Sequence, residues 1–316
     1  MLISSLSVII GLALLIYSSD KFIDGAASVA EHSKVSPLVI GLLILGFGTS
    51  APEIMVSIFA ALADEPELAL GNAIGSNIAN IALVLGVTAI IANVEVKSSI
   101  LKLELPILIV ANIITAFLML NNYLSFIDGL ILISLLVVVL TWMIKSKNNQ
   151  DHLDIEISQS IIKMPIKSAW LWTISGLILL IISSKLLVWG AENIANALGV
   201  SDLVIGLTII AIGTSLPELA TSITAVLKNK HDMAIGNVIG SNLFNLLAVI
   251  GIAAVIRPFE ISPIALYRDF LIMFVLTVYL YIDLIVGKNT LTRKNGILLS
   301  ASFVAYLVLL FYTHSF

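Results

Sequence analysis

The residues best suited to chemistry are two glutamates inside apolar segments. Glu53 ends a Gly-Thr-Ser-Ala-Pro-Glu motif at 48–53, and Glu218 ends a Gly-Thr-Ser-Leu-Pro-Glu motif at 213–218, an offset of 165 residues. A carboxylate at the centre of a membrane helix opposes insertion by roughly 2.5 to 3.5 kcal/mol. Each glutamate therefore needs a compensating partner, and a bound cation would be one.

A proline in each motif predicts a broken helix. Pro52 has no N–H to donate to the carbonyl of Gly48, and Pro217 has none for Gly213. Backbone oxygens released at membrane depth are tolerated only where they face protein or a wet cavity. A carboxylate beside such oxygens and beside hydroxyl groups predicts a cation site. The hydroxyls belong to Thr49, Ser50, Thr214 and Ser215.

A second motif repeats at the same offset, Gly-Asn-Ala-Ile-Gly-Ser-Asn-Ile-Ala-Asn at 71–80 and Gly-Asn-Val-Ile-Gly-Ser-Asn-Leu-Phe-Asn at 236–245. Helical spacing places Ser76 with Asn80, and Ser241 with Asn245, on single faces. For the asparagines one turn earlier, Asn72 and Asn237, hydrogen bonds between helices and a role in the cation site are equally plausible.

All these candidates offer hard oxygen ligands, which suit Ca2+ or Na+ rather than zinc or copper. Ca2+ takes about six to eight oxygens at roughly 2.3 to 2.6 Å. The predicted ligands are Glu53, Glu218, Thr49, Thr214, Ser50, Ser215, Ser76, Ser241, Asn80 and Asn245.

The composition indicates a polytopic membrane protein. The 316 residues are 59% hydrophobic and 11% charged, with a mean hydropathy of +1.10, far outside the soluble range. The absence of cysteine excludes disulfides and thiolate metal sites. No His-Glu-x-x-His motif occurs, so we predict neither an enzyme nor a cofactor. The expected partners are the transported ions and the lipid bilayer, with no nucleic acid and no protein partner.

Ten apolar stretches of about 20 residues predict ten transmembrane helices in an all-α fold. The expected spans are 2–19, 37–62, 68–91, 101–120, 125–144, 168–189, 202–227, 233–256, 267–287 and 295–313. The polar stretch 145–167 reads as a linker between a first five-helix repeat at 1–144 and a second at 168–316. The charged residues Asp20, Asp24, Glu192, Asp128, Glu104 and Asp269 fall near predicted helix ends and are interpreted as structural. Glu104 and Asp269 share the offset of 165 residues, which leaves a role at a cavity mouth open for these two.

The two halves are copies of each other. At the offset of 165, 14 of 23 positions are identical over 35–57 and 8 of 12 over 69–80. Because five spans is an odd number, the second copy must enter the membrane from the opposite side. Inverted repeats of this kind are typical of secondary transporters, with the substrate site at mid-membrane.

The positive-inside rule gives the orientation. Thirteen lysines and arginines fall in the odd-numbered loops and three in the even-numbered loops. This distribution places the linker in the cytoplasm and both termini outside. The N-terminus lacks a basic region and a cleavage site, so we expect the first span to be retained.

At these motifs the sequence resembles the cation/calcium antiporter superfamily, and most closely its prokaryotic Na+/Ca2+ exchanger branch. The resemblance covers nearly the whole chain. It implies that Glu53 and Glu218 bind Ca2+ together with the backbone of Thr49 and Thr214. It further implies two sets of Na+ ligands, Thr49, Ser50, Glu53 and Ser76 in one set and Thr214, Ser215, Glu218 and Ser241 in the other.

Three positions refine the comparison with that superfamily. Proton-coupled members typically carry asparagine where this chain has Thr49 and Thr214, which favours Na+ as the driving ion. Potassium-dependent members tend to carry aspartate where this chain has Asn245, although some sodium-driven members do as well.

The expected function is therefore exchange of Ca2+ for Na+ by alternating access, with the first span of each half sliding against the other helices. Exchange of Ca2+ for H+ on the same fold is the main alternative, and a cation channel is a second one. The expected location is the cell membrane, or the inner membrane of a double-membraned cell.

Overall fold

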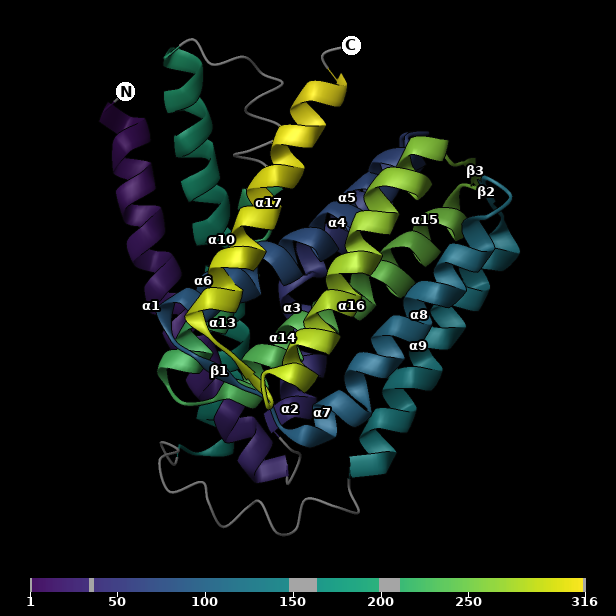
Figure 1. Cartoon of the computed structure of the whole chain (residues 1–316). Helices are drawn as coiled ribbons and strands as arrows, with labels where there is room; N and C mark the ends of the chain where they lie inside the picture. The colour runs from purple at the N-terminus through teal and green to yellow at the C-terminus, as the bar shows by residue number, and fades with distance from the viewer. Residues whose placement is uncertain (1, 34–36, 148–163, 199–210, 315–316) are drawn as a thin grey trace.

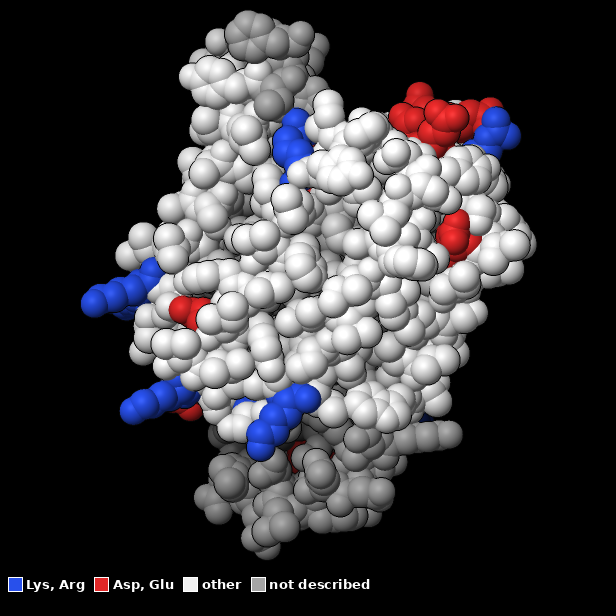
Figure 2. Space-filling view, turned by 45° about the vertical axis from the view of Figure 1, so that its right-hand side comes forward, with Lys and Arg blue, Asp and Glu red and all other residues white. Residues whose placement is uncertain are grey.

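The computed structural model describes residues 2–33, 37–147, 164–198 and 211–314, and these residues are almost entirely helical (Figure 1). Exposed leucine, isoleucine and valine side chains cover the outer helices, and the face in Figure 2 is white over most of its area. An apolar exterior of this kind is what a bilayer requires of the helices that it surrounds.

The first half contains the long helix α1 (Leu2–Ser33), a broken second span, a third span with a π-helical segment, and two further helices. The broken span is formed by α2 (Pro37–Ile40), η1 (Gly41–Gly46), α3 (Phe47–Thr49) and α4 (Ala51–Leu62). The third span is α5 (Pro66–Ala79), η2 (Asn80–Leu85) and α6 (Gly86–Ile91). The short α7 (Ser98–Lys102) precedes α8 (Glu104–Met119) and α9 (Phe126–Lys147).

The second half follows the same order. It contains α10 (Ile166–Ala197), α12 (Ala211–Thr214), α13 (Leu216–Leu227), α14 (His231–Leu243), η5 (Phe244–Val249) and α15 (Ile250–Ile256). The last helices are η6 (Ala265–Phe270), α16 (Leu271–Val286) and α17 (Arg293–His314).

Within the described residues, 8 helices are long and apolar enough to cross a membrane, and the pair Leu38–Thr49 and Ala51–Leu62, bent by 44°, gives up to 9. The all-α, polytopic prediction is thus confirmed. Of the predicted span at 202–227, only the part from 211 onward lies within the described residues, so ten spans remain a prediction.

Two boundary predictions were wrong. The first span was expected to end at Ser19, but α1 continues to Ser33, so Asp20 and Asp24 lie inside this helix rather than at its end. The helix tolerates both carboxylates because Lys228 and Lys230, in the turn after α13, pair with them. Similarly, α10 runs to Ala197 instead of 189.

Helices α1 and α10 pack along each other at one side of the molecule (Figure 1). A Cβ added at Gly11 would lie 2.9 Å from the backbone nitrogen of Leu187, and one at Gly176 would lie 2.9 Å from that of Phe22. The two contacts are related by the offset of 165 residues. Small residues at such positions let helix backbones approach closely.

Two short antiparallel pairs join the halves at their loops. β1 (Val94–Glu95) pairs with β4 (Thr290–Leu291), and β2 (Tyr123–Leu124) pairs with β3 (Phe259–Glu260). Between these loops, the spans 66–91 and 231–256 are the most buried of the candidate spans. They carry the second motif of each half and so place it in the protein interior.

Candidate functional site

Both predicted helix breaks are present. α3 ends at Thr49 and α4 begins at Ala51, with Ser50 between them at φ −82° and ψ 0°. α12 ends at Thr214 and α13 begins at Leu216, with Ser215 at φ −91° and ψ 5°. Each new helix starts with proline in its first turn, where the missing N–H costs little.

The breaks place both glutamates in the first turn of a helix, Glu53 in α4 and Glu218 in α13. The N-terminus of a helix carries a partial positive charge, which stabilises a carboxylate there. In the second half, the carbonyl of Gly213 accepts a hydrogen bond of 2.9 Å from the hydroxyl of Ser184 on α10. A side chain of the neighbouring span thus donates a hydrogen bond to a carbonyl that Pro217, which has no N–H, cannot satisfy.

The two carboxylates lie close enough for their charges to interact, and each glutamate is 1% exposed. Oε2 of Glu53 and both carboxylate oxygens of Glu218 are buried without a hydrogen-bond partner. The Glu218 carboxylate lies near the hydroxyls of Thr49, Ser50 and Ser241. Buried charge without compensation costs several kcal/mol, so a cation is the natural complement of this pair.

Thr49 connects the two halves. Its hydroxyl donates to the carbonyl of Leu45 at 2.9 Å and lies 3.2 Å from Oδ1 of Asn237 and 3.3 Å from Oγ of Ser241. The Ser241 hydroxyl in turn donates to the carbonyl of Gly46 at 3.3 Å. The structure thus groups Thr49 of the first half with Ser241 of the second, whereas the spacing within the motifs grouped each with its own half.

The remaining predicted ligands are mostly buried polar groups with unused hydrogen-bonding capacity. Oγ of Ser50, Oγ of Ser215, Oδ1 of Asn80 and both polar side-chain atoms of Asn245 are buried without partners. Ser76 is 5% exposed, and Thr214 is half-buried at the end of α12. An unsatisfied buried polar group costs about 1–3 kcal/mol, so their concentration around two carboxylates points to a ligand.

Two asparagines play a larger part than the sequence indicated. The Asn237 side chain donates to the carbonyl of Glu218 at 3.2 Å and approaches the hydroxyls of Thr221 at 3.0 Å and Ser222 at 2.9 Å. Asn237 does form hydrogen bonds between helices, as predicted. It also supports the Glu218 backbone and lies next to Thr49.

Asn242 was not among the predicted site residues. Its carbonyl accepts a hydrogen bond of 3.1 Å from Asn77, and its Oδ1 accepts one of 3.0 Å from Asn80. Asn77 and Asn242 occupy the same place in the two copies of the second motif. The repetition of Gly-Ser-Asn in both copies was the available signal.

Among the described residues, no group of three or more histidine, cysteine, aspartate or glutamate side chains could hold a metal. The candidate site instead combines two carboxylates with hydroxyl, amide and backbone oxygens, which suits a hard cation.

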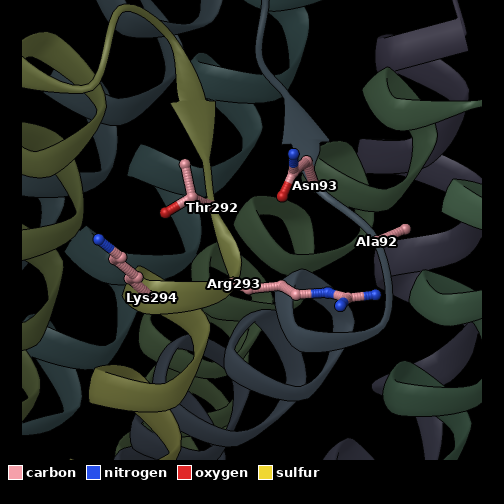
Figure 3. Close-up of a pocket in the computed structure, with 5 residues that line it drawn as sticks. All are labelled: Ala92, Asn93, Thr292, Arg293 and Lys294. Atoms are coloured by element: carbon pink, nitrogen blue, oxygen red, sulfur yellow. The ribbon is translucent and has the colours of Figure 1, made fainter.

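A separate cavity of about 510 Å³ lies beside the β1–β4 pair (Figure 3). Its lining includes the basic residues Arg293 and Lys294. Positive charges there oppose cation binding, so this cavity is not an alternative to the glutamate site.

Comparison with known proteins identifies the family. The family profile described as "Sodium/calcium exchanger protein" matches residues 3–145 and 168–312. The chain is 43% identical to the putative antiporter CaxA of Alkalimonas amylolytica, covering 98% of this chain and 99% of that protein. It is 35% identical to the inner membrane protein YrbG of Escherichia coli, covering 99% and 98%.

A third relative is the sodium/calcium exchanger MaX1 of Methanosarcina acetivorans, 28% identical over 98% of this chain and 99% of that protein. Among solved structures, the sodium-calcium exchanger NCX_Mj superimposes with a TM-score of 0.83 at 32% identity, covering 97% and 98% of the two chains. The chain is therefore a multi-pass membrane protein of the sodium/calcium exchanger family, within the cation/calcium antiporter superfamily.

Proposed function

We propose that this protein exchanges Ca2+ for Na+ across the membrane by alternating access at the site around Glu53 and Glu218. The observation that carries the proposal is the pair of buried carboxylates with unpartnered oxygens, set among buried hydroxyl and amide groups. The relative MaX1 and the structural neighbour NCX_Mj are both described as sodium/calcium exchangers. The proposed ligands are Glu53, Glu218, Thr49, Thr214, Ser50, Ser215, Ser76, Ser241, Asn80 and Asn245.

Electrostatics explains why exchange would be coupled. Two carboxylates neutralise one Ca2+, and several Na+ ions can replace it. A site closed without ions would bury two unpaired negative charges, which costs several kcal/mol. The protein therefore rearranges readily only when loaded, and three Na+ against one Ca2+ would move one net charge in each cycle.

The proposed architecture is ten spans arranged as two inverted repeats of five. In support, equivalent residues Asn77 and Asn242 contact each other, and the family profile matches in two blocks separated by the linker. The two strand pairs are also equivalent. Val94 and Glu95 correspond to Phe259 and Glu260 at the offset of 165, and Tyr123 and Leu124 correspond to Thr290 and Leu291 at an offset of 167. With the positive-inside rule, this topology places both termini outside and the linker in the cytoplasm.

The moving unit in this proposal is the α1–α10 pair. Its two helices are joined by close glycine contacts, whereas the strand pairs tie loops of the other helices together. The pair also contacts the rest of the protein unequally. Ser19 of α1 bonds Thr224 of α13 at 2.8 Å, while Phe59, the counterpart of Thr224 on α4, is 61% exposed.

The driving ion separates this proposal from its main alternative, exchange of Ca2+ for H+. Thr49 and Thr214 favour Na+, because the resemblance associates asparagine at these positions with proton coupling. In proteoliposomes of the purified protein, we expect an outward Na+ gradient to drive Ca2+ uptake, and an outward H+ gradient to drive little. Uptake driven by H+ alone would overturn the assignment of Na+, and uptake independent of either gradient would indicate a channel.

Asn237 provides a second prediction, because its counterpart Asn72 is a matched control. We expect Asn237→Ala to raise the apparent KM for Ca2+ roughly tenfold, about 1.4 kcal/mol, with a smaller change in maximal rate. The loss removes support from the Glu218 backbone and the neighbour of the Thr49 hydroxyl.

Asn72→Ala should change the KM much less. Its amide lies 3.4 Å from the carbonyl of Glu53 and 3.5 Å from Oγ of Ser57, and its side chain is partly exposed. Initial uptake rates over a range of Ca2+ concentrations measure both variants. Equal KM values for the two would contradict the positioning role of Asn237.

A further inference from the structure

Four charged side chains join α1 to the turn between α13 and α14. Nζ of Lys228 lies 2.6 Å from Oδ1 of Asp20 and 2.8 Å from Oδ1 of Asp24, and Nζ of Lys230 lies 3.6 Å from Asp24. The lysine at 228 also donates to the Asp20 carbonyl at 3.1 Å. We call these four residues the α1 ion-pair cluster.

The cluster is partly shielded from solvent. The side chains of Asp24, Lys230 and Lys228 are 9%, 15% and 24% exposed, and that of Asp20 is 42% exposed. Burial lowers the pKa of Lys230, and the charge of Asp24 opposes that effect. Ion pairs that are partly buried are screened less by salt than pairs on an open surface, so this cluster can hold α1 in place.

At the opposite end of the α1–α10 pair, the α4–α5 turn is equivalent to the α13–α14 turn, but no ion pair joins it to α10 within the described residues. The α4–α5 turn resembles the α13–α14 turn, since Asp64 has φ 63° and its counterpart Asn229 has φ 57°. The residues equivalent to the cluster are Lys185 and Trp189 on α10 and Ala63 and Glu65 at this turn. Lys185, Trp189 and Glu65 are exposed, and no ion pair joins α10 to the turn within the described residues.

The charges at two of these equivalent positions are reversed. Lys185 stands where the first half has Asp20, and Glu65 stands where the second half has Lys230. In the present arrangement Asp20 pairs with Lys228 and Lys230 pairs with Asp24, so Asp20 and Lys230 are not direct partners, although their charges interact. If the α1–α10 pair shifts so that α10 packs on the α4–α5 turn as α1 now packs on the α13–α14 turn, Lys185 and Glu65 come to the places of Asp20 and Lys230, and their opposite charges attract. Such a shift would break the α1 ion-pair cluster and bring these two charges together.

We propose that the ion pairs are specific to the two access states. The α1 ion-pair cluster holds the α1–α10 pair in the arrangement seen here, and the attraction between Lys185 and Glu65, in the places of Asp20 and Lys230, favours the opposite arrangement. The inference rests on the alternating-access part of the proposed function. It adds a set of residues, remote from the ion ligands, that determines how the two states are populated.

The chain has no cysteine, so disulfide cross-linking can report the position of the pair without background. One reporter is Ser19→Cys with Thr224→Cys, whose hydroxyl oxygens lie 2.8 Å apart. The other is Phe59→Cys with Ser184→Cys, the equivalent residues at the opposite end. Each reporter joins the two halves, so a protease site introduced into the linker reveals cross-linked protein as halves that stay together in denaturant.

The test compares the ratio of the first cross-link to the second under fixed ion conditions. We expect Lys228→Gln and Asp24→Asn to lower the ratio about fivefold, and Lys185→Gln and Glu65→Gln to raise it by a similar factor, since a pair worth about 1 kcal/mol changes a population by that amount. The charge swap Glu65→Lys with Lys185→Glu keeps the two charges opposite, so it should return the ratio to the value of the unmodified protein. Lys97→Gln is the control, because it removes a different ion pair, the one that Lys97 forms with Asp232 of α14 at 3.0 Å.

Ratios that match the Lys97→Gln control in all four variants would overturn the inference, as would failure of the second cross-link to form in any of them. Lys185 and Glu65 are exposed, so their variants decide the matter if Lys228→Gln does not fold. The ratio reports helix position and not the driving ion. Ca2+ uptake driven by H+ would therefore overturn the assignment of Na+ alone, and Na+-driven uptake with unchanged ratios would overturn this inference alone.

Discussion

Glu53→Gln and Glu218→Gln are each expected to reduce Na+-driven Ca2+ uptake at least about a hundredfold. Glutamine keeps the size of the side chain but removes one of the two charges that would neutralise Ca2+. Breaking a buried charge arrangement by removing one member costs about 3–5 kcal/mol, and each 1.4 kcal/mol is about a tenfold change in affinity. Both carboxylates are 1% exposed, so water cannot replace the lost charge effectively.

Two measurements test this expectation. Initial rates of Ca2+ uptake into proteoliposomes report transport, and the rise in Tm on adding Ca2+ reports binding, because a ligand bound by the folded state stabilises it. Glu104→Gln is a matched control, since Glu104 is 0% exposed but lies on α8, a helix that carries none of the proposed ligands. Normal uptake by either site variant, or an equal loss in the control, would contradict the two-glutamate site.

The chemistry of the site is largely readable from the sequence because its elements are local. A glutamate and a proline in one short apolar motif predict a carboxylate at a helix break, and both breaks are present. Which helices cross is not local information. The contact between Thr49 and Ser241 joins residues 192 positions apart, and no spacing within either motif specifies it.

The length of α1 was missed for a related reason. Asp20 lowers the hydropathy of its own segment, and the sequence therefore predicts an end at Ser19. Its partner Lys228 is 208 residues away, so a window moved along the chain does not contain the compensating charge. The π-helical segment that begins at Asn80 and the one that contains Asn245 were missed for a different reason. An extra residue in one helical turn leaves little trace in a 3.6-residue period.

The repeat predicted equivalent halves, but the two halves are not used equally. Asn237 makes hydrogen bonds of 2.9 to 3.2 Å, whereas its counterpart Asn72 makes contacts of 3.4 and 3.5 Å. The ion pairs on α1 likewise have no counterpart on α10 within the described residues. Under the proposed alternating access, a structure of one access state breaks the symmetry between the repeats, so the sequence repeat would predict the average of the two states rather than either one.

Gly240→Ala is expected to destabilise the fold strongly, because the crossing of η1 and α14 has no space for a side chain. A Cβ there would lie 2.5 Å from the carbonyl oxygen and 2.9 Å from the Cα of Leu42, both backbone atoms that cannot rotate away. Overpacking of this kind typically costs about 1–3 kcal/mol and occasionally more. For a chain of this size we expect Tm to fall by roughly 5 °C or more.

Gly48→Ala is the control for that substitution. Its Cβ would meet only the side chain of Leu177, with Cδ2 at 2.8 Å, and a leucine side chain can change rotamer. Thermal unfolding of the purified variants in detergent measures the difference, and equal Tm values would contradict the crossing argument. The same crossing brings Gly46 against Gly240 and Thr49 beside Ser241. Any folded Gly240→Ala protein should therefore also bind Ca2+ more weakly, which would link the packing of the two halves to the proposed ion site.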